Sequence, residues 1–97
     1  SRGLGDVYKR QSFDGAAIVK SAAEHPNNVA AQLDAADLEM IQGEYASAFD
    51  RLLGLAAEVT PDERETIRVR LLELFEVAGR TSSDVLKARR RLTTVLF

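Results

Sequence analysis

Histidine, cysteine and converging acids build most catalytic and metal sites, and this chain offers few of them. Its 97 residues contain one histidine, His25, and no cysteine. A transition-metal site needs several nitrogen or sulfur ligands, and a thiol nucleophile or a disulfide needs cysteine. The sequence also lacks a G-x-x-x-x-G-K-[ST] loop and a G-x-G-x-x-G turn, which would hold phosphates. We therefore predict no metal site, no cofactor and no enzymatic activity.

The acidic residues follow a helical spacing. Asp34, Asp37 and Glu44 are interpreted as a solvated face, because no base or nucleophile accompanies them in a catalytic pattern. His25 directly precedes Pro26, and a residue before proline disfavours the helical conformation. His25 is therefore expected in solvent at a helix end, where the helix dipole favours positive charge.

Basic residues gather near the end of the chain, at Lys87, Arg89, Arg90 and Arg91. Lys87 and Arg91 are four residues apart, so they share one face of a helix. Such a face is solvated, meets an acidic protein surface or contacts nucleic-acid phosphates. The net charge of −2, the pI near 5.4 and the absence of interleaved aromatic residues argue against nucleic acid. The predicted partner-binding residues are Lys87, Arg90, Arg91, Leu96 and Phe97.

Charge is unevenly distributed along the sequence. Residues 12–63 hold two bases and ten acids, whereas residues 64–97 hold eight bases and four acids. Two interpretations remain open. The two halves attract each other when packed, or the basic end meets an acidic partner.

Hydrophobic periodicity predicts an all-α fold. Five helices are expected, near 13–24, 28–42, 44–59, 63–78 and 82–96. Caps and stops support these ranges, at Asn28, Gly43, Thr60, Gly79 and Ser83. The segment from Thr60 to Glu63 is the strongest signal, because it combines a capping box with proline at the first helical position.

Each predicted helix has an apolar side. Phe13, Ala16, Ala17, Val19 and Ala23 form that of the first helix, part of which is expected to lie open. Leu38 and Ile41 are expected to widen the buried side of the second helix. Leu74 and Phe75 are expected among the most buried residues. The stripe of the last helix is expected to pack on the helix before it, through Val85, Ala88, Leu92 and Val95.

An internal repeat organises these helices. The prolines of "HPNN" and "TPDE" lie 35 residues apart, close to the tetratricopeptide period of about 34 residues. Gly43, Tyr45 and Ala48 match G-x-Y-x-x-A, the turn between the two helices of that repeat. Gly43 lets the chain reverse, and Ala48 lets two helices approach closely. The pattern predicts antiparallel helical hairpins stacked as a tetratricopeptide-like array.

The end of the chain carries a family resemblance. "LLELFEVAG" followed by "ARRRLTTVLF" resembles the C-terminus of the bacterial thioredoxin-fused tetratricopeptide family, described as co-chaperones or chaperedoxins. The resemblance covers about residues 12–97. It implies a protein-interaction module of a thioredoxin-like co-chaperone, which binds unfolding clients and a chaperonin. The family's redox chemistry belongs to a thioredoxin domain with a C-x-x-C motif, and this sequence contains neither.

The first residues differ from the rest. Residues 1–11, SRGLGDVYKRQ, resemble translated sequencing-adapter read-through, so we expect a non-native or disordered tail. Residues 12–97 are then a helical domain truncated at its N-terminal side. No apolar run approaches 18 residues and no signal peptide is visible, so we expect a cytoplasmic protein without a membrane partner.

Overall fold

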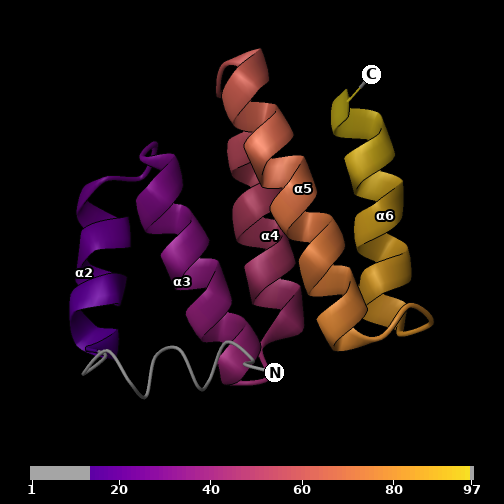
Figure 1. Ribbon diagram of the computed structural model, residues 1–97, viewed down its shortest axis with the longest axis horizontal. Helices are drawn as coiled ribbons and strands as arrows, with labels where there is room; N and C mark the ends of the chain where they lie inside the picture. Colours follow the sequence, from indigo (N-terminus) through magenta and orange to yellow (C-terminus); the bar gives the residue numbers. More distant parts are fainter. Residues whose placement is uncertain (1–13, 97) are drawn as a thin grey trace.

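A computed structural model describes residues 14–96 of the chain, except for the side chain of Leu96. These residues form five α-helices and no strand (Figure 1). The helices are α2 (Gly15–Glu24), α3 (Val29–Ile41), α4 (Tyr45–Ala56), α5 (Pro61–Ala78) and α6 (Ser83–Leu96). The all-α prediction is confirmed, and every helix bound lies within three residues of the expected one.

The predicted capping signals set several of these bounds. The Asn28 side chain accepts a hydrogen bond from the backbone N–H of Ala31 at 3.0 Å. Thr60 and Glu63 form a reciprocal capping box, with backbone-to-side-chain distances of 3.2 and 3.3 Å. Gly43 and Gly79 adopt φ values of +80° and +102°, which residues with a Cβ rarely adopt. The start of α6 differs slightly, because Ser82 rather than Ser83 accepts the capping bond.

Successive helices run in opposite directions, and α5 passes in front of α4 in Figure 1. Helix α3 packs against α2, α4 and α5, while α4 packs against α3, α5 and α6. Helix α6 contacts α4 more extensively than it contacts α5. The expectation that the last helix rests on α5 was therefore incomplete. Its apolar stripe lies over both α4 and α5.

The core lies where α3, α4, α5 and α6 meet, and the largest fully buried side chains there include Phe49 and Phe75. Leu74 and Phe75 are 2% and 0% exposed, as predicted. Ala48 is also 0% exposed, in agreement with a close approach of helices at that residue. Ile41 is 42% exposed, so its predicted burial was wrong. It is the last residue of α3, and the chain turns away directly after it.

Among the described residues, only one side of α2 is covered by another helix. Ala22 is its only buried residue within the described part of the chain, although Ala16, Ala17, Val19 and Ala23 were predicted to form its apolar side. Those four residues are exposed, and Phe13 lies outside the described residues. The expectation of an open apolar side is thus confirmed at Val19, which is 57% exposed.

Candidate protein-binding site

Helix α6 carries basic residues at positions outside its apolar stripe. It begins where the Ser82 hydroxyl accepts a hydrogen bond from the backbone N–H of Val85 at 3.2 Å. The stripe faces the core as predicted: Val85, Ala88 and Leu92 are buried and Val95 packs against the core. Because these residues fix the rotation of α6, Arg90 points away from the core, while Lys87, Arg89 and Arg91 lie along the flanks of the stripe.

The predicted partner-binding residues fall into three groups. Lys87 and Arg90 are exposed, and their side chains form no ion pair or hydrogen bond within residues 14–96. Arg91 is exposed too, but it forms an ion pair with Asp50 of α4. The side chain of Leu96 and the whole of Phe97 lie outside the described part of the structure. The structure therefore places Lys87, Arg90 and Arg91 on one helix. Lys87 and Arg90 have no partner among residues 14–96.

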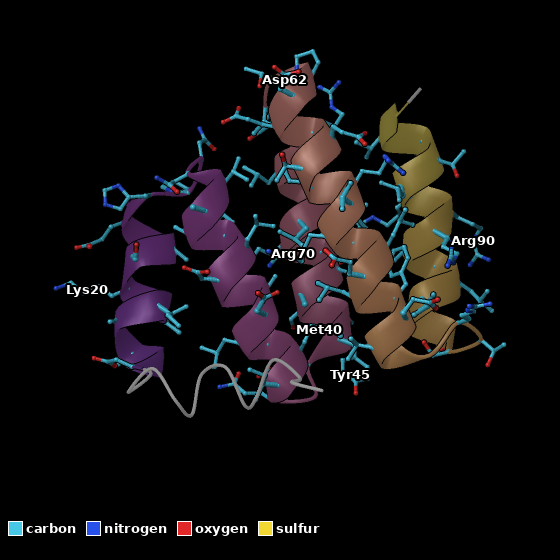
Figure 2. All side chains as sticks on the ribbon, viewed as in Figure 1. Lys20, Met40, Tyr45, Asp62, Arg70 and Arg90 are labelled. Carbon is cyan, nitrogen blue, oxygen red and sulfur yellow. The ribbon has the colours of Figure 1, made fainter. Side chains whose placement is uncertain are left out.

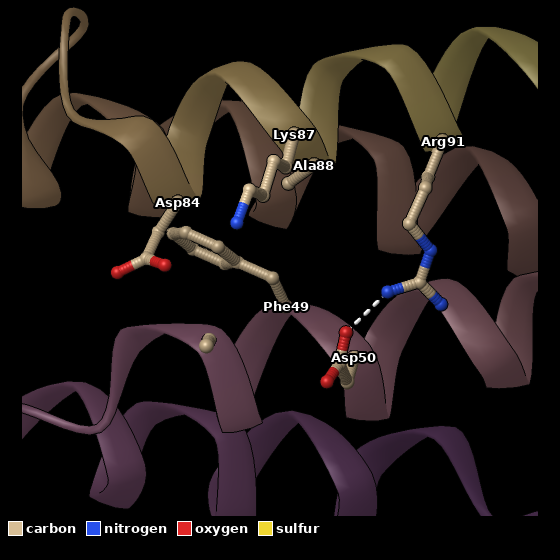
Figure 3. A pocket seen from close by; sticks show the side chains of 7 residues that line it. Phe49, Asp50, Asp84, Lys87, Ala88 and Arg91 are labelled. Atoms are coloured by element: carbon tan, nitrogen blue, oxygen red, sulfur yellow. Dashed lines mark hydrogen bonds and ion pairs between the residues drawn. The ribbon is translucent and has the colours of Figure 1, made fainter.

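A groove runs between α4 and α6 (Figure 3). Figure 3 shows Lys87 extending toward Phe49, with Arg91 pointing at Asp50. The groove is lined by Ala46, Phe49, Asp50, Asp84, Lys87, Ala88 and Arg91. Its two acids and two bases give it mixed charge around a buried aromatic ring. Such a lining suits contact with a polar protein segment rather than with a polyanion.

Arg89 has a structural role instead. Its guanidinium lies over the Phe75 ring, 5.1 Å from the ring centroid, in a cation–π arrangement. Nearby, Arg80 donates to the Glu76 carboxylate at 2.8 and 2.9 Å, and this hydrogen bonding lowers the pKa of Glu76 below its usual value. These contacts join the end of α5 to the turn and to α6.

Asp37 corrects the predicted solvated acidic face. It is 6% exposed, because Arg70 of α5, labelled in Figure 2, reaches across to α3. Arg70 donates to the Oδ2 of Asp37 at 2.7 Å. Burial raises the pKa of Asp37, and the Arg70 charge and hydrogen bond oppose that shift. Its other oxygen, Oδ1, is buried and has no hydrogen-bond partner within the described residues. The remaining members of the predicted face, Asp34 and Glu44, are exposed as expected.

A shallow groove lies beside Arg70 on α5, lined by Glu65, Thr66, Val69, Arg70 and Glu73. No sequence motif marks this region. Asp37 and Arg70 lie 33 residues apart in the sequence, and a motif of a few residues cannot predict a contact over that separation. The repeat period was the only available signal, because it places equivalent positions of α3 and α5 side by side.

Three further observations concern metal ions, His25 and the membrane. Within residues 14–96, no cluster of three His, Cys, Asp or Glu side chains could hold a metal ion. His25 is exposed directly after α2, as expected. No described helix combines the length and the apolar character that crossing a membrane requires.

Comparison with known proteins adds an independent observation. A family model described as Tetratricopeptide repeat matches residues 8–97. Relatives include uncharacterized proteins of Mycobacterium bovis and Mycobacterium tuberculosis, which are 29% identical over 90 residues. The match covers 82% of this chain, which spans about 30% of the length of these relatives. No solved structure gives a significant match.

Proposed function

This chain belongs to the tetratricopeptide-repeat family, and on that premise we propose that it is the protein-binding domain of a thioredoxin-like co-chaperone. Tetratricopeptide-repeat domains are generally non-catalytic modules for protein–protein interaction. In this proposal the partners are unfolding clients and a chaperonin, and the compartment is the cytoplasm. The resemblance of residues 67–97 to the end of the chaperedoxin family supports this assignment.

The observation that carries the proposal is the outer face of α6. Lys87 and Arg90 are exposed and unpaired within residues 14–96, on a helix whose opposite side is fixed in the core. Arg91 extends the same face and its ion pair with Asp50 is exposed, so a partner carboxylate can compete for it. Leu96 and Phe97 belong to the proposed contact on the basis of the sequence alone. An acidic patch on a chaperonin would complement this face.

An upstream thioredoxin domain is part of the same proposal. The matched region amounts to 30% of each mycobacterial relative, so a protein of that length has room for a second domain. In such a protein the thioredoxin domain would carry the redox chemistry, while the helical domain would bind the partner. Sequencing the reading frame upstream of Ser1 in the source DNA tests this part directly.

The binding part is tested by titrating the domain onto immobilised chaperonin. We expect Lys87→Glu/Arg90→Glu to slow association by about tenfold at low salt, because charge reversal removes steering toward an acidic surface. The difference should shrink as salt is added, since screening acts on exposed charges. The matched control is Lys20→Glu, which reverses an exposed charge on α2. Equal association rates for the wild type, Lys87→Glu/Arg90→Glu and Lys20→Glu, all folded, would contradict the proposed contact.

A further inference from the structure

Exposed charges of opposite sign lie at the two ends of the helical array. Figure 1 shows α2 and α6 at opposite ends, and these two helices make no contact with each other. At the α2 end, Glu24 and Asp34 are exposed acids that form no ion pair within residues 14–96. At the α6 end, Lys87 and Arg90 are exposed bases that form none there either. One copy of the chain therefore cannot bring these acids and bases together.

An apolar groove lies at the acidic end, between α2 and α3. It is lined by Gly15, Ala16, Val19, Lys20, Leu38 and Gln42. Val19 is 57% exposed, so its aliphatic side chain is largely uncovered within residues 14–96. Asp34 lies one helical turn before Leu38, and Glu24 lies one turn after Lys20. Because α2 and α3 run in opposite directions, both acids flank the same end of the groove. Lys20 is the one base in its lining.

The exposed strip of α6, formed by Leu86, Lys87 and Arg90, repeats this pattern with the opposite charge. Leu86 is 47% exposed, although it belongs to a helix whose stripe is buried in the core. Arg90 lies one helical turn after Leu86, and Lys87 directly follows Leu86. An aliphatic side chain and a cation are therefore one turn apart on this strip. The same spacing separates the aliphatic lining of the groove from the acids that flank it.

We propose that the groove between α2 and α3 binds the α6 strip of a second copy of this chain. Leu86 of one copy packs against Val19 in the groove of the other and removes apolar surface of both from water. Arg90 then lies beside the two acids that flank the groove, where charge attraction orients the contact. The contact covers the open apolar side of α2 and joins the acidic end of one copy to the basic end of the next.

One chain carries both halves of this contact, which is why the occupant is a second copy. The groove and the α6 strip lie at opposite ends of the array, so the contact is head-to-tail. In a dimer, one copy keeps its groove free and the other keeps its α6 strip free, so further copies can add. A contact of this kind buries little surface, so association should be weak. The contact needs no other partner and does not depend on the proposed function.

Analytical ultracentrifugation of the chain alone tests the proposal. At low salt and about 0.1–1 mM protein, we expect the average mass to rise with concentration above the 10.6 kDa of one chain. Added salt should return the average mass toward that of one chain, because salt screens exposed charges. An average mass that stays at 10.6 kDa over this whole concentration range would overturn the proposal.

Charge reversal at either end tests which surfaces meet. Glu24→Lys/Asp34→Lys makes both halves of the contact basic, so this variant should stay monomeric. Lys87→Glu/Arg90→Glu makes both halves acidic and should stay monomeric as well. The first variant keeps a basic α6 strip and the second keeps an acidic groove, so an equimolar mixture of the two should associate again. Circular dichroism checks that each variant is folded. A mixture that stays monomeric, or single variants that associate like the wild type, would overturn the proposal.

Further variants locate the apolar part of the contact. Leu86→Gln and Val19→Gln keep a good helix former at exposed positions, and each should weaken association about tenfold through lost apolar burial. Val77→Gln is the matched control, because Val77 is 59% exposed on α5, away from both surfaces. Glu58→Lys/Asp62→Lys reverses two exposed acids near the turn between α4 and α5 and should associate like the wild type. Equal association of Leu86→Gln, Val77→Gln and the wild type would overturn the contact at the groove.

Discussion

Phe49 of α4 and Phe75 of α5 meet edge to face in the core, with ring centroids 5.0 Å apart and ring planes at 84°. Both side chains are buried, at 2% and 0% exposure. This arrangement places the positive edge of one ring against the negative face of the other. Arg89 of α6 lies over Phe75 as well, so a single aromatic side chain joins three helices.

Truncation of Phe75 should therefore be among the most damaging core substitutions. We expect Phe75→Ala to lower the free energy of unfolding by about 3–5 kcal/mol, which combines lost apolar burial with the cavity left behind. That is a large part of the stability of a small domain. The control is Val77→Ala on the same helix, where the side chain is 59% exposed and the change should be small. Urea denaturation followed by circular dichroism measures both, and similar midpoints would contradict the role of Phe75.

Helix positions could be predicted from the sequence wherever a local signal set them. Thr60 and Glu63 lie three residues apart, and their capping box forms as expected. Gly43 and Gly79 adopt the positive φ that their places between helices suggested. Such signals act within one helical turn, so no knowledge of the tertiary structure is needed to recognise them.

Individual polar contacts between helices could not be predicted. Helix α4 ends at Ala56 rather than near residue 59, and Arg64 of α5 donates to the carbonyl oxygens of Ala56 and Val59 at 2.8 and 3.2 Å. The last four carbonyl groups of a helix have no partner within it, and this contact satisfies that of Ala56. The burial of Asp37 likewise depends on Arg70. Of the candidate binding residues, Lys87 and Arg90 were placed correctly in solvent, while the pairing of Arg91 with Asp50 was not foreseen.

Two glycine substitutions should change stability in opposite directions. A Cβ at Gly43 or at Gly54 would meet no atom within 4 Å, so neither alanine variant clashes. Gly43 has φ of +80°, and Gly43→Ala should lower the free energy of unfolding by about 1 kcal/mol through backbone strain. Gly54 lies inside α4, and Gly54→Ala should raise the free energy of unfolding by about 0.5–1 kcal/mol. Thermal melts compare the two variants, and a shift in the same direction would contradict this account.

Gln32 ties α2 to the rest of the domain. Its buried side chain donates to the carbonyl oxygens of Ala22 and His25 at 2.8 and 3.1 Å, and it accepts from Arg51 at 2.8 Å. Arg51 is held in turn by Glu39, with an Nε-to-oxygen distance of 2.9 Å. The carbonyl groups at the end of α2 therefore depend on one amide side chain of α3.

Replacing that amide should loosen α2 selectively. Gln32→Met keeps the length of the side chain but removes its donors and acceptor, and we expect a loss of about 1–3 kcal/mol from the buried groups left unpaired. Hydrogen exchange should quicken at the amides of α2 more than at those of α5, because α3 is the one described helix on which α2 packs. Gln42→Met, at an exposed position, is the matched control. Equal exchange in α2 for wild type and Gln32→Met would refute this role.

Asp37 should make stability depend on pH in the direction opposite to most acids. Burial raises the pKa of Asp37 in the folded protein above its ordinary value near 3.8. The folded state therefore binds this proton more tightly than the unfolded chain does. Asp37 makes its whole contribution to stability below the pKa that it has in the unfolded chain. This contribution declines as pH rises through the higher pKa that Asp37 has in the folded protein. Glu65 and Glu76 have lowered pKa values and act in the reverse sense, so wild type alone cannot isolate Asp37.

Comparison with Asp37→Asn removes the shared background. Asparagine has no charge to lose, so the free energy of unfolding of wild type minus that of Asp37→Asn should rise as pH falls from neutrality toward the ordinary pKa of aspartate. Gln42→Met, at an exposed position without a titratable group, is the control, and its difference from wild type should stay nearly constant over that range. Urea titrations at several pH values measure both differences. A difference for Asp37→Asn that falls with decreasing pH would mean that Arg70, rather than burial, sets the pKa of Asp37.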